Sequence, residues 1–231
     1  MSGSRFTLGA AGALFVALAI AWPAASSSAQ PKPAPRSAAP STPLPPSPPP
    51  EPDLAYGAFQ RGLYLTAFHE ATKRAAENND PKAMTLLGEL YADGLGVPND
   101  DNKAVDWYKL AIERGDREAM FSLAMFRMSG RGGPADRSEA ARLLGEAAKR
   151  GHVIAAYDLA LLYLEGQVFP QDFAKAAVLM RQAADAGSPQ AQYALATFYK
   201  EGRGVAKDTQ EATRLLAAAA RAGMTEAEVE Y

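Results

Sequence analysis

Side chains that could perform chemistry are few in this chain, and their spacing supports no reaction. Cysteine is absent, which removes disulfides and thiolate metal ligands, and the two histidines, His69 and His152, stand far apart. Ser129 and Ser188 lack a histidine placed to complete a catalytic triad. We therefore predict a protein that is not an enzyme, with no catalytic residue, no metal and no cofactor, and we interpret both histidines as structural.

Two further patterns could suggest chemistry, and each has a simpler structural explanation. The Gly-x-Gly turns, as at Gly94 and Gly96, resemble part of a phosphate-binding loop, but no Gly-Lys-Ser/Thr sequence and no preceding strand accompanies them. The neighbouring carboxylates Asp100 and Asp101 fall where a helix cap is expected, and Glu226 with Glu228 fall on a solvated face. Both patterns are interpreted as structural.

The elements that position these residues follow from a thirty-six-residue repeat. Alanine recurs at positions 83, 119, 155, 191 and 227, leucine at 87, 123, 159 and 195, and aspartate at 100, 136, 172 and 208, without an insertion. Chance does not align so many columns, and a fixed period of this length is typical of stacked helical units. The structural glycines of the repeat are Gly94, Gly96, Gly115, Gly130, Gly151, Gly166, Gly187, Gly202, Gly204 and Gly223.

Each repeat has the sequence features of two helices. Asp80, with Pro81 after it, is suited to cap a first helix near 81–93, and Asp100 a second helix near 101–114. The glycine after each helix can adopt the left-handed conformation that ends it. Asn79 stands one repeat upstream of Gly115 and is the next residue best suited to that conformation, which predicts a degenerate unit before it.

The N-terminus has the composition of a secretion signal followed by a spacer. Arg5 precedes a short apolar run over 8–22, and Ser27 and Ala29 suit a cleavage before Gln30. The run is too short for a comfortable membrane span, so only an uncleaved signal would anchor the chain. Eleven prolines between positions 31 and 52 predict an extended linker. We expect a periplasmic or secreted protein.

These features predict a division of the chain into eight parts. They are a signal peptide over 1–29, a Pro-rich linker over 30–53, a degenerate helical unit over 54–79, repeats over 80–115, 116–151, 152–187 and 188–223, and a partial repeat over 224–231. The formal net charge is −2, with both signs interspersed along the helices. Nucleic acid is therefore excluded as a partner, because its phosphates require a basic stripe.

The pattern A-x-x-x-L-G-x-x-Y-x-x-G-x-G-V-x-x-D-x-x-x-A-x-x-W-x-x-x-A-A-x-x-G, which residues 83–115 match almost without exception, resembles the Sel-1-like repeat, a relative of the tetratricopeptide repeat. Departures in later copies, such as Val168 and Phe169 in place of Gly-Val, are local. The resemblance implies an all-α, right-handed α-solenoid of antiparallel helix pairs whose first helices line a concave surface.

The resemblance also implies a function. Family members act as adaptors that organise protein complexes, and exported bacterial members include periplasmic regulators and proteins that engage host factors. Cysteine-rich members have been described as penicillin-binding or beta-lactamase-like, so a beta-lactam or cell-wall hydrolase is the alternative, although this chain lacks their paired cysteines. A protein or peptide partner is the favoured expectation.

Residues that vary between repeats are the candidates for binding a partner, because constant positions serve the packing that every unit needs. Three columns on the first helix of the later units are mostly apolar or aromatic, of the types favoured in interfaces. Packing between successive first helices explains these side chains equally well. The candidates are Phe121, Met125, Met128, Tyr157, Leu161, Leu164, Tyr193 and Thr197.

The C-terminal end prompts one more expectation. Tyr231 falls half-way through the helix that should begin the next unit, and so short a helix has little stability of its own. We expect Leu215, Leu216 and Ala219 to be poorly covered there, unless a longer chain or a partner packs on them.

Overall fold

A computed structural model describes residues 53–230, and within this range the chain is helical and has no strand. The helices are α1 (Leu54–Gln60), α2 (Tyr64–Asn78), α3 (Pro81–Asp93), α4 (Asp101–Glu113), α5 (Arg117–Ser129), α6 (Arg137–Lys149), α7 (Val153–Glu165), α8 (Phe173–Asp185), α9 (Pro189–Glu201), α10 (Thr209–Arg221) and α11 (Thr225–Glu230). The predicted signal peptide and all of the linker except Asp53 lie outside the described residues.

Local capping explains where the helices begin. Asp80 caps α3, as predicted, by accepting a hydrogen bond from a backbone N–H group of the first turn. Asp116 and Ser188 likewise cap α5 and α9. The aspartates at 100, 136, 172 and 208 cap α4, α6, α8 and α10 in the same way. His152 takes this role in α7, where its Nδ1 accepts from the N–H of Ala155 at 3.0 Å.

Left-handed residues end the helices. The glycines that follow the second helix of each unit have φ between +80° and +92°. Asn79, which follows α2, has φ of +51° and is the one non-glycine residue with positive φ in the described range. The predicted role of Asn79 is therefore confirmed, and residues 54–79 form a helix pair like those that follow, with a shortened first member.

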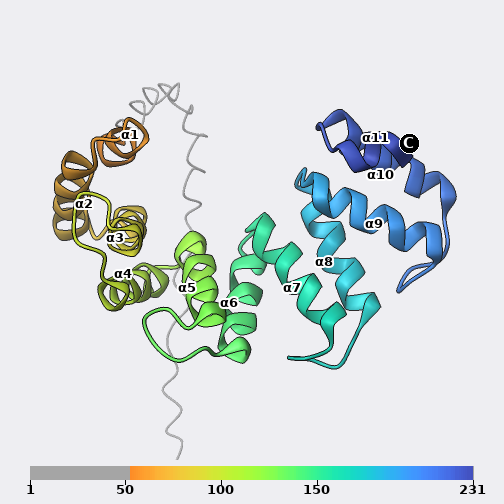
Figure 1. The fold of residues 1–231 in the computed structure, drawn as a ribbon, viewed down its shortest axis with the longest axis horizontal. Coiled ribbons are helices and arrows are strands. Elements are labelled where there is room, and N and C mark those ends of the chain that lie inside the picture. Colours follow the sequence, from red (N-terminus) through yellow and green to blue (C-terminus); the bar gives the residue numbers. More distant parts are fainter. Residues whose placement is uncertain (1–52, 231) are drawn as a thin grey trace, which may run out of the picture. The chain divides into compact units, whose positions relative to one another are not determined.

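Helices that follow one another in the chain pack against one another in space (Figure 1). Within a unit, the first helix (the A helix: α3, α5, α7 or α9) packs on the second (the B helix: α4, α6, α8 or α10), and each B helix packs on the next A helix. The A helices α3 and α5 also contact each other, as do α1 and α3. This succession of helix pairs is an α-solenoid, and the predicted fold class is confirmed.

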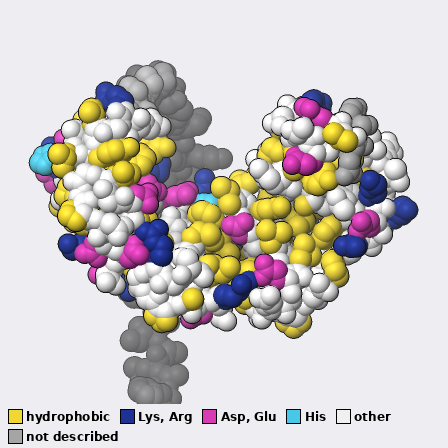
Figure 2. Space-filling view, in the orientation of Figure 1, with side chains coloured by type: hydrophobic (Ala, Val, Ile, Leu, Met, Phe, Trp, Pro, Cys, Tyr) yellow, Lys and Arg dark blue, Asp and Glu magenta, His cyan; other side chains and the backbone are white. Residues whose placement is uncertain are grey.

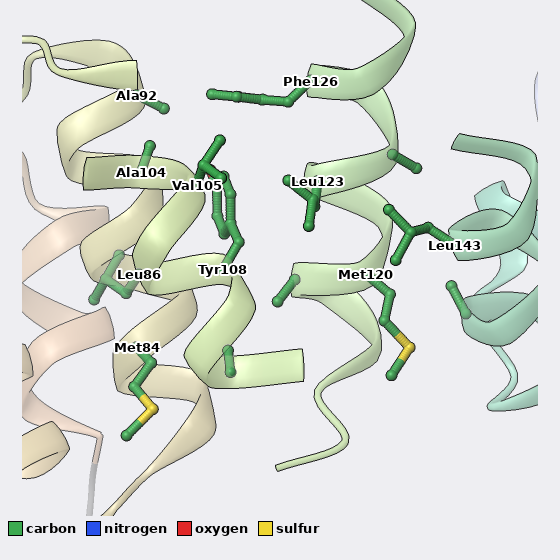
Figure 3. Packing of buried hydrophobic residues seen from close by; sticks show 14 of the residues in the cluster. Met84, Leu86, Ala92, Ala104, Val105, Tyr108, Met120, Leu123, Phe126 and Leu143 are labelled. Carbon is green, nitrogen blue, oxygen red and sulfur yellow. The ribbon is translucent and has the colours of Figure 1, made fainter. Parts of the chain in front are cut away.

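The core runs along the interfaces between these helices. Figure 3 shows Val105 and Tyr108 of α4 facing Leu123 and Phe126 of α5. All four are buried, and the Tyr108 and Phe126 rings meet edge to face with centroids 5.5 Å apart. Such contacts bury the apolar side of every helix against its neighbours, which is how a unit without a core of its own becomes stable.

One contact in the first unit depends on a glycine inside a helix. A Cβ atom added to Gly88 of α3 would lie 2.4 Å from Cε1 of Tyr108. The other units have a larger residue on the A helix and a smaller one on the B helix at the same two positions. Those pairs are Ala124 with Leu144, Ala160 with Met180, and Ala196 with Leu216. Volume lost on one helix is thus matched by volume gained on the other.

The expectation that the last complete unit is poorly covered is wrong. Leu215, Leu216 and Ala219 of α10 are 2%, 7% and 0% exposed. The six-residue α11 packs on α10, and its Ala227 is fully buried in the same apolar cluster, joined by the half-buried Met224. Leu215, Leu216 and Ala219 are therefore buried in a helix that packs on both α9 and α11.

Candidate functional site

The eight residues predicted to bind a partner lie on three A helices. Positions i, i+4 and i+7 fall on one side of a helix, so each A helix presents its candidates as a single stripe. We call these eight residues the apolar face. They are Phe121, Met125 and Met128 on α5, Tyr157, Leu161 and Leu164 on α7, and Tyr193 and Thr197 on α9.

Every residue of the apolar face is half-buried. The side chains on α5 pack against one core cluster, and Tyr157, Leu161, Leu164 and Tyr193 pack against the next. These seven side chains therefore contribute to packing while they keep part of their surface in solvent. Figure 2 shows apolar side chains gathered across the middle of the visible face of the solenoid, with charged side chains around them.

His152 connects the apolar face to a charged neighbour. Its ring stacks on Phe121 with centroids 4.5 Å apart and is only 6% exposed. Because Nδ1 accepts the N–H of Ala155, the ring proton lies on Nε2 and is donated to the Glu118 carboxylate at 3.2 Å. This hydrogen bond lowers the pKa of Glu118, although partial burial opposes the change.

The first repeat has polar residues where the later repeats have the apolar face. Thr85 and Glu89 on α3 stand thirty-six residues before Phe121 and Met125. The Thr85 hydroxyl is buried, at 2.9 Å from Oδ1 of Asp116 and 3.0 Å from the carbonyl oxygen of Pro81. The A-helix side of the solenoid therefore changes from polar to apolar between the first and second repeats.

A pocket of about 540 Å³ lies at this polar end, between α1, α3 and α5. Its lining combines the aromatic side chains of α1 with carboxylates contributed by residue 53 and by the residues at α3 and α5. The pocket is lined by Asp53, Ala55, Tyr56, Phe59, Lys82, Ala83, Thr85, Leu86, Glu89, Asp116, Arg117 and Glu118.

Glu89 is the electrostatically unusual residue of this pocket. Its pKa is raised from 4.5 to about 7. Burial is the largest cause, and the nearby carboxylates of Glu118, Asp93 and Asp116 add to it. Near neutral pH the carboxyl group is therefore divided between its protonated and ionised forms. A group poised in this way inside a pocket is a candidate for binding, because an added positive charge would favour the ionised form.

The residues considered for catalysis do not converge. His69 is exposed on α2, whereas His152 is engaged as a helix cap. The Ser129 hydroxyl donates to the carbonyl of Met125 at 2.8 Å, and the Ser188 hydroxyl caps α9. In residues 53–230 no group of three or more histidine, aspartate and glutamate side chains is arranged to hold a metal ion.

The sequence pattern did not place Thr85 and Glu89 in a site. The pocket depends on α1, whose unit departs from the repeat, so no column indicated that Tyr56 and Phe59 would face α3. The contact between His152 and Phe121 was also missed. A signal for it existed, since a bulky aromatic ring at the capping position must find space on the preceding A helix.

Helix pairs of fixed length, stacked in chain order and joined by glycine turns, define the class of tetratricopeptide-like solenoids. The model of the Sel1 repeat matches residues 81–116, 117–152, 153–188 and 189–224, each beginning one residue after the repeat proposed from the sequence. The chain belongs to the Sel1 repeat family. Solenoids of this family generally act as non-catalytic scaffolds for protein–protein interaction.

Solved structures with the same fold include three bacterial proteins. A Sel1 repeat protein from Oxalobacter formigenes is 33% identical, with a TM-score of 0.69 over 76% of this chain and 54% of its own. The protective antigen c5321 of uropathogenic Escherichia coli is 28% identical, with a TM-score of 0.67 over 75% of this chain and 39% of its own. A Sel1 repeat protein from Klebsiella pneumoniae is 25% identical, with a TM-score of 0.50 over 76% of this chain and 87% of its own.

This chain thus spans about half the length of the first of these proteins and less of the second. No curated protein matches it. In the described part of the chain, no helix combines the length and the apolar character needed to cross a membrane.

Proposed function

We propose that this protein is an exported, non-enzymatic scaffold that binds a protein or peptide along the apolar face of its A helices. The observation that carries the proposal is the half-burial of all eight side chains of that face. Packing holds each aromatic, methionine or leucine side chain in place, and the exposed part remains available for contact. Side chains held in this way lose little further freedom on binding, which favours affinity.

The chemical character of the face supports a protein partner. Tyrosine, phenylalanine and methionine are enriched at the centres of protein interfaces, where they supply large contact areas. Family membership supports the same class of partner, since Sel1 repeat proteins typically bind proteins. The apolar stripes on the successive A helices α5, α7 and α9 suit an extended or helical peptide that lies across these helices.

Export is proposed from the N-terminal sequence alone. Arg5, the apolar run over 8–22 and the small residues Ser27 and Ala29 fit a signal that is cleaved before Gln30. N-terminal sequencing of the protein recovered from its native cells tests this directly. We expect the mature chain to begin at Gln30, and a chain that retains Met1 in the cytoplasm would contradict the proposed location.

Site-specific photo-crosslinking in the native cell tests the binding face. A benzoylphenylalanine residue placed at Leu161, on the apolar face, should form a discrete crosslinked complex. The matched control is Val178 of α8, which is 70% exposed and lies on a B helix. Mass spectrometry of both products then identifies what each position touches.

The outcome distinguishes a specific binding face from an apolar surface that associates nonspecifically. A complex that forms from position 161 and not from position 178 supports the proposal, because both positions are apolar and differ in the helix that carries them. Equal crosslinking from the two positions, or none from position 161 with a folded protein, would show that the apolar face is packing surface only.

A further inference from the structure

The pocket between α1, α3 and α5 continues the apolar face at its N-terminal end. Thr85 and Glu89 occupy in the first repeat the positions of Phe121 and Met125 in the second. Phe121 stacks on His152, which in turn donates a hydrogen bond to Glu118, and Glu118 lines the pocket. A peptide that lies along the apolar face therefore reaches the pocket without leaving the A helices.

Three of the four carboxylates that line this pocket already have partners. Asp53 forms an ion pair with Arg74, Asp116 accepts the Thr85 hydroxyl, and Glu118 accepts from His152. Glu89 is different, because among the described residues it forms neither a hydrogen bond nor an ion pair. A half-buried carboxylate surrounded by other carboxylates lacks the cation that would balance it.

The pocket also has an aromatic part. Tyr56 and Phe59 of α1 stack with ring centroids 6.2 Å apart, and Tyr56 is 50% exposed. Aromatic rings attract cations through their electron-rich faces, and carboxylates bind them directly. A pocket of about 540 Å³ that is lined by both aromatic rings and carboxylates has room and chemistry for one cationic side chain.

We infer that this pocket receives a lysine or arginine side chain of the partner, whose neighbouring apolar residues lie along α5 and α7. The inference rests on the proposed function for the apolar part of the contact, while the pocket itself can be tested alone. The inference restricts the partner to proteins or peptides that have a basic residue next to apolar residues.

The two cations that line the pocket do not neutralise Glu89. Arg117 points to the turn after α6, where its guanidinium donates to the carbonyl oxygens of Arg150 and Gly151, both at 3.1 Å. Lys82 is exposed and forms no ion pair with Glu89. The ionisable groups that face the pocket or Glu89 are Asp53 and Tyr56 on α1, Lys82 and Asp93 on α3, Tyr108 on α4, and Asp116, Arg117 and Glu118 on α5.

The first experiment titrates the full chain with Nα-acetyl-arginine methylamide and with its neutral citrulline analogue, followed by the amide NMR signals. We expect the arginine probe to shift signals around Thr85 and Glu89 and to bind at least ~5-fold more tightly than citrulline, as one ion pair near a protein surface implies. Binding should strengthen from pH 6 to pH 8, because Glu89, with its pKa of about 7, becomes ionised over that range.

Matched variants make the result specific. Glu89→Gln keeps the shape of the side chain and should reduce arginine binding to the citrulline level. Glu113→Gln removes the same charge from an exposed position on α4 and should leave the preference unchanged. Equal affinity for the two probes, or a preference that survives Glu89→Gln in a folded protein, would overturn the inference.

A selection of random displayed peptides on the full chain separates this inference from the proposed function. Wild-type protein should select apolar peptides enriched in lysine or arginine, and Glu89→Gln should select apolar peptides without that enrichment. If both proteins select apolar peptides without basic enrichment, the proposed cation pocket is contradicted and the proposed binding role of the apolar face is supported. If arginine binds in the NMR titration but no peptide is selected, the proposed binding role of the apolar face is contradicted and the cation pocket is supported.

Discussion

The first and third repeats share a packing scheme and differ in the surface that they present. Ala83 and Leu87 in α3 are buried, as are Ala155 and Leu159 at the same positions in α7. Two residues after each of these packing positions, α3 carries Thr85 and Glu89, whereas α7 carries Tyr157 and Leu161. A solenoid can therefore change the chemistry of its A-helix side from one unit to the next without altering its core.

The largest expected effect comes from making the core of the first unit resemble that of the others. Gly88→Ala should lower the free energy of unfolding by about 3 kcal/mol, because the new methyl group collides with the Tyr108 ring. Adding Tyr108→Leu should recover most of that loss, since Ala with Leu is the pair found in the second and fourth repeats. Urea unfolding of both variants measures the recovery, and a double variant no better than Gly88→Ala would refute the volume compensation.

A second test removes the charge that distinguishes the face of α3. The folded protein binds a proton at Glu89 more tightly than the unfolded chain does, because the pKa rises from 4.5 to about 7 on folding. The stability associated with this group is therefore complete below pH 4.5 and is lost as pH rises through 7. Glu89→Gln should be about 2 kcal/mol more stable than wild type at pH 8, with a difference that shrinks towards pH 4.5.

Chemical unfolding across this pH range gives the measurement, and Glu113→Gln supplies the control. Glu113→Gln removes the same charge from an exposed position on α4. A Glu89→Gln variant whose advantage is the same at pH 5 and pH 8 would mean that the charge of Glu89 is not what destabilises the first repeat.

The third test concerns the aromatic side of the comparison. Replacing Tyr157 and Tyr193 together with alanine should reduce the crosslinked complex formed from position 161 about tenfold, the loss of affinity expected for truncated aromatic anchors. Both side chains are half-buried, so the helical circular dichroism signal should persist. An unfolded double variant whose remaining soluble fraction still crosslinks normally would place both tyrosines in the core.

The smallest expected effect is at the capping position of the third repeat. His152→Asp keeps an acceptor for the N–H of Ala155, and so retains the cap, but it loses the stack on Phe121 and the bond to Glu118. We expect a loss of about 1 kcal/mol, with His152→Ala lower by about 1 kcal/mol more. Equal stability of the two variants in thermal unfolding would show that the cap contributes nothing.

The sequence predicted the helices well because their limits depend on nearby residues. Caps such as Asp80 and left-handed residues such as Asn79 act within one turn of chain, and the repeat supplied four copies of each signal. The pocket depends instead on contacts between units. Tyr56 lies in the unit that departs from the repeat, and the half-burial of Tyr157 follows from how closely α7 approaches its neighbours, which no spacing in the sequence encodes.

The matched pair of Gly88 and Tyr108 also bears on how such a chain can change by recombination. Both residues lie inside one thirty-six-residue unit, so a duplicated unit inherits the small residue together with the large one. A crossover between the two positions would instead join a glycine to a leucine, leaving a void, or an alanine to a tyrosine, creating a collision. Exchange with the first repeat is therefore tolerated at the boundaries of units, and its stretch from residue 88 to residue 108 is inherited as one block.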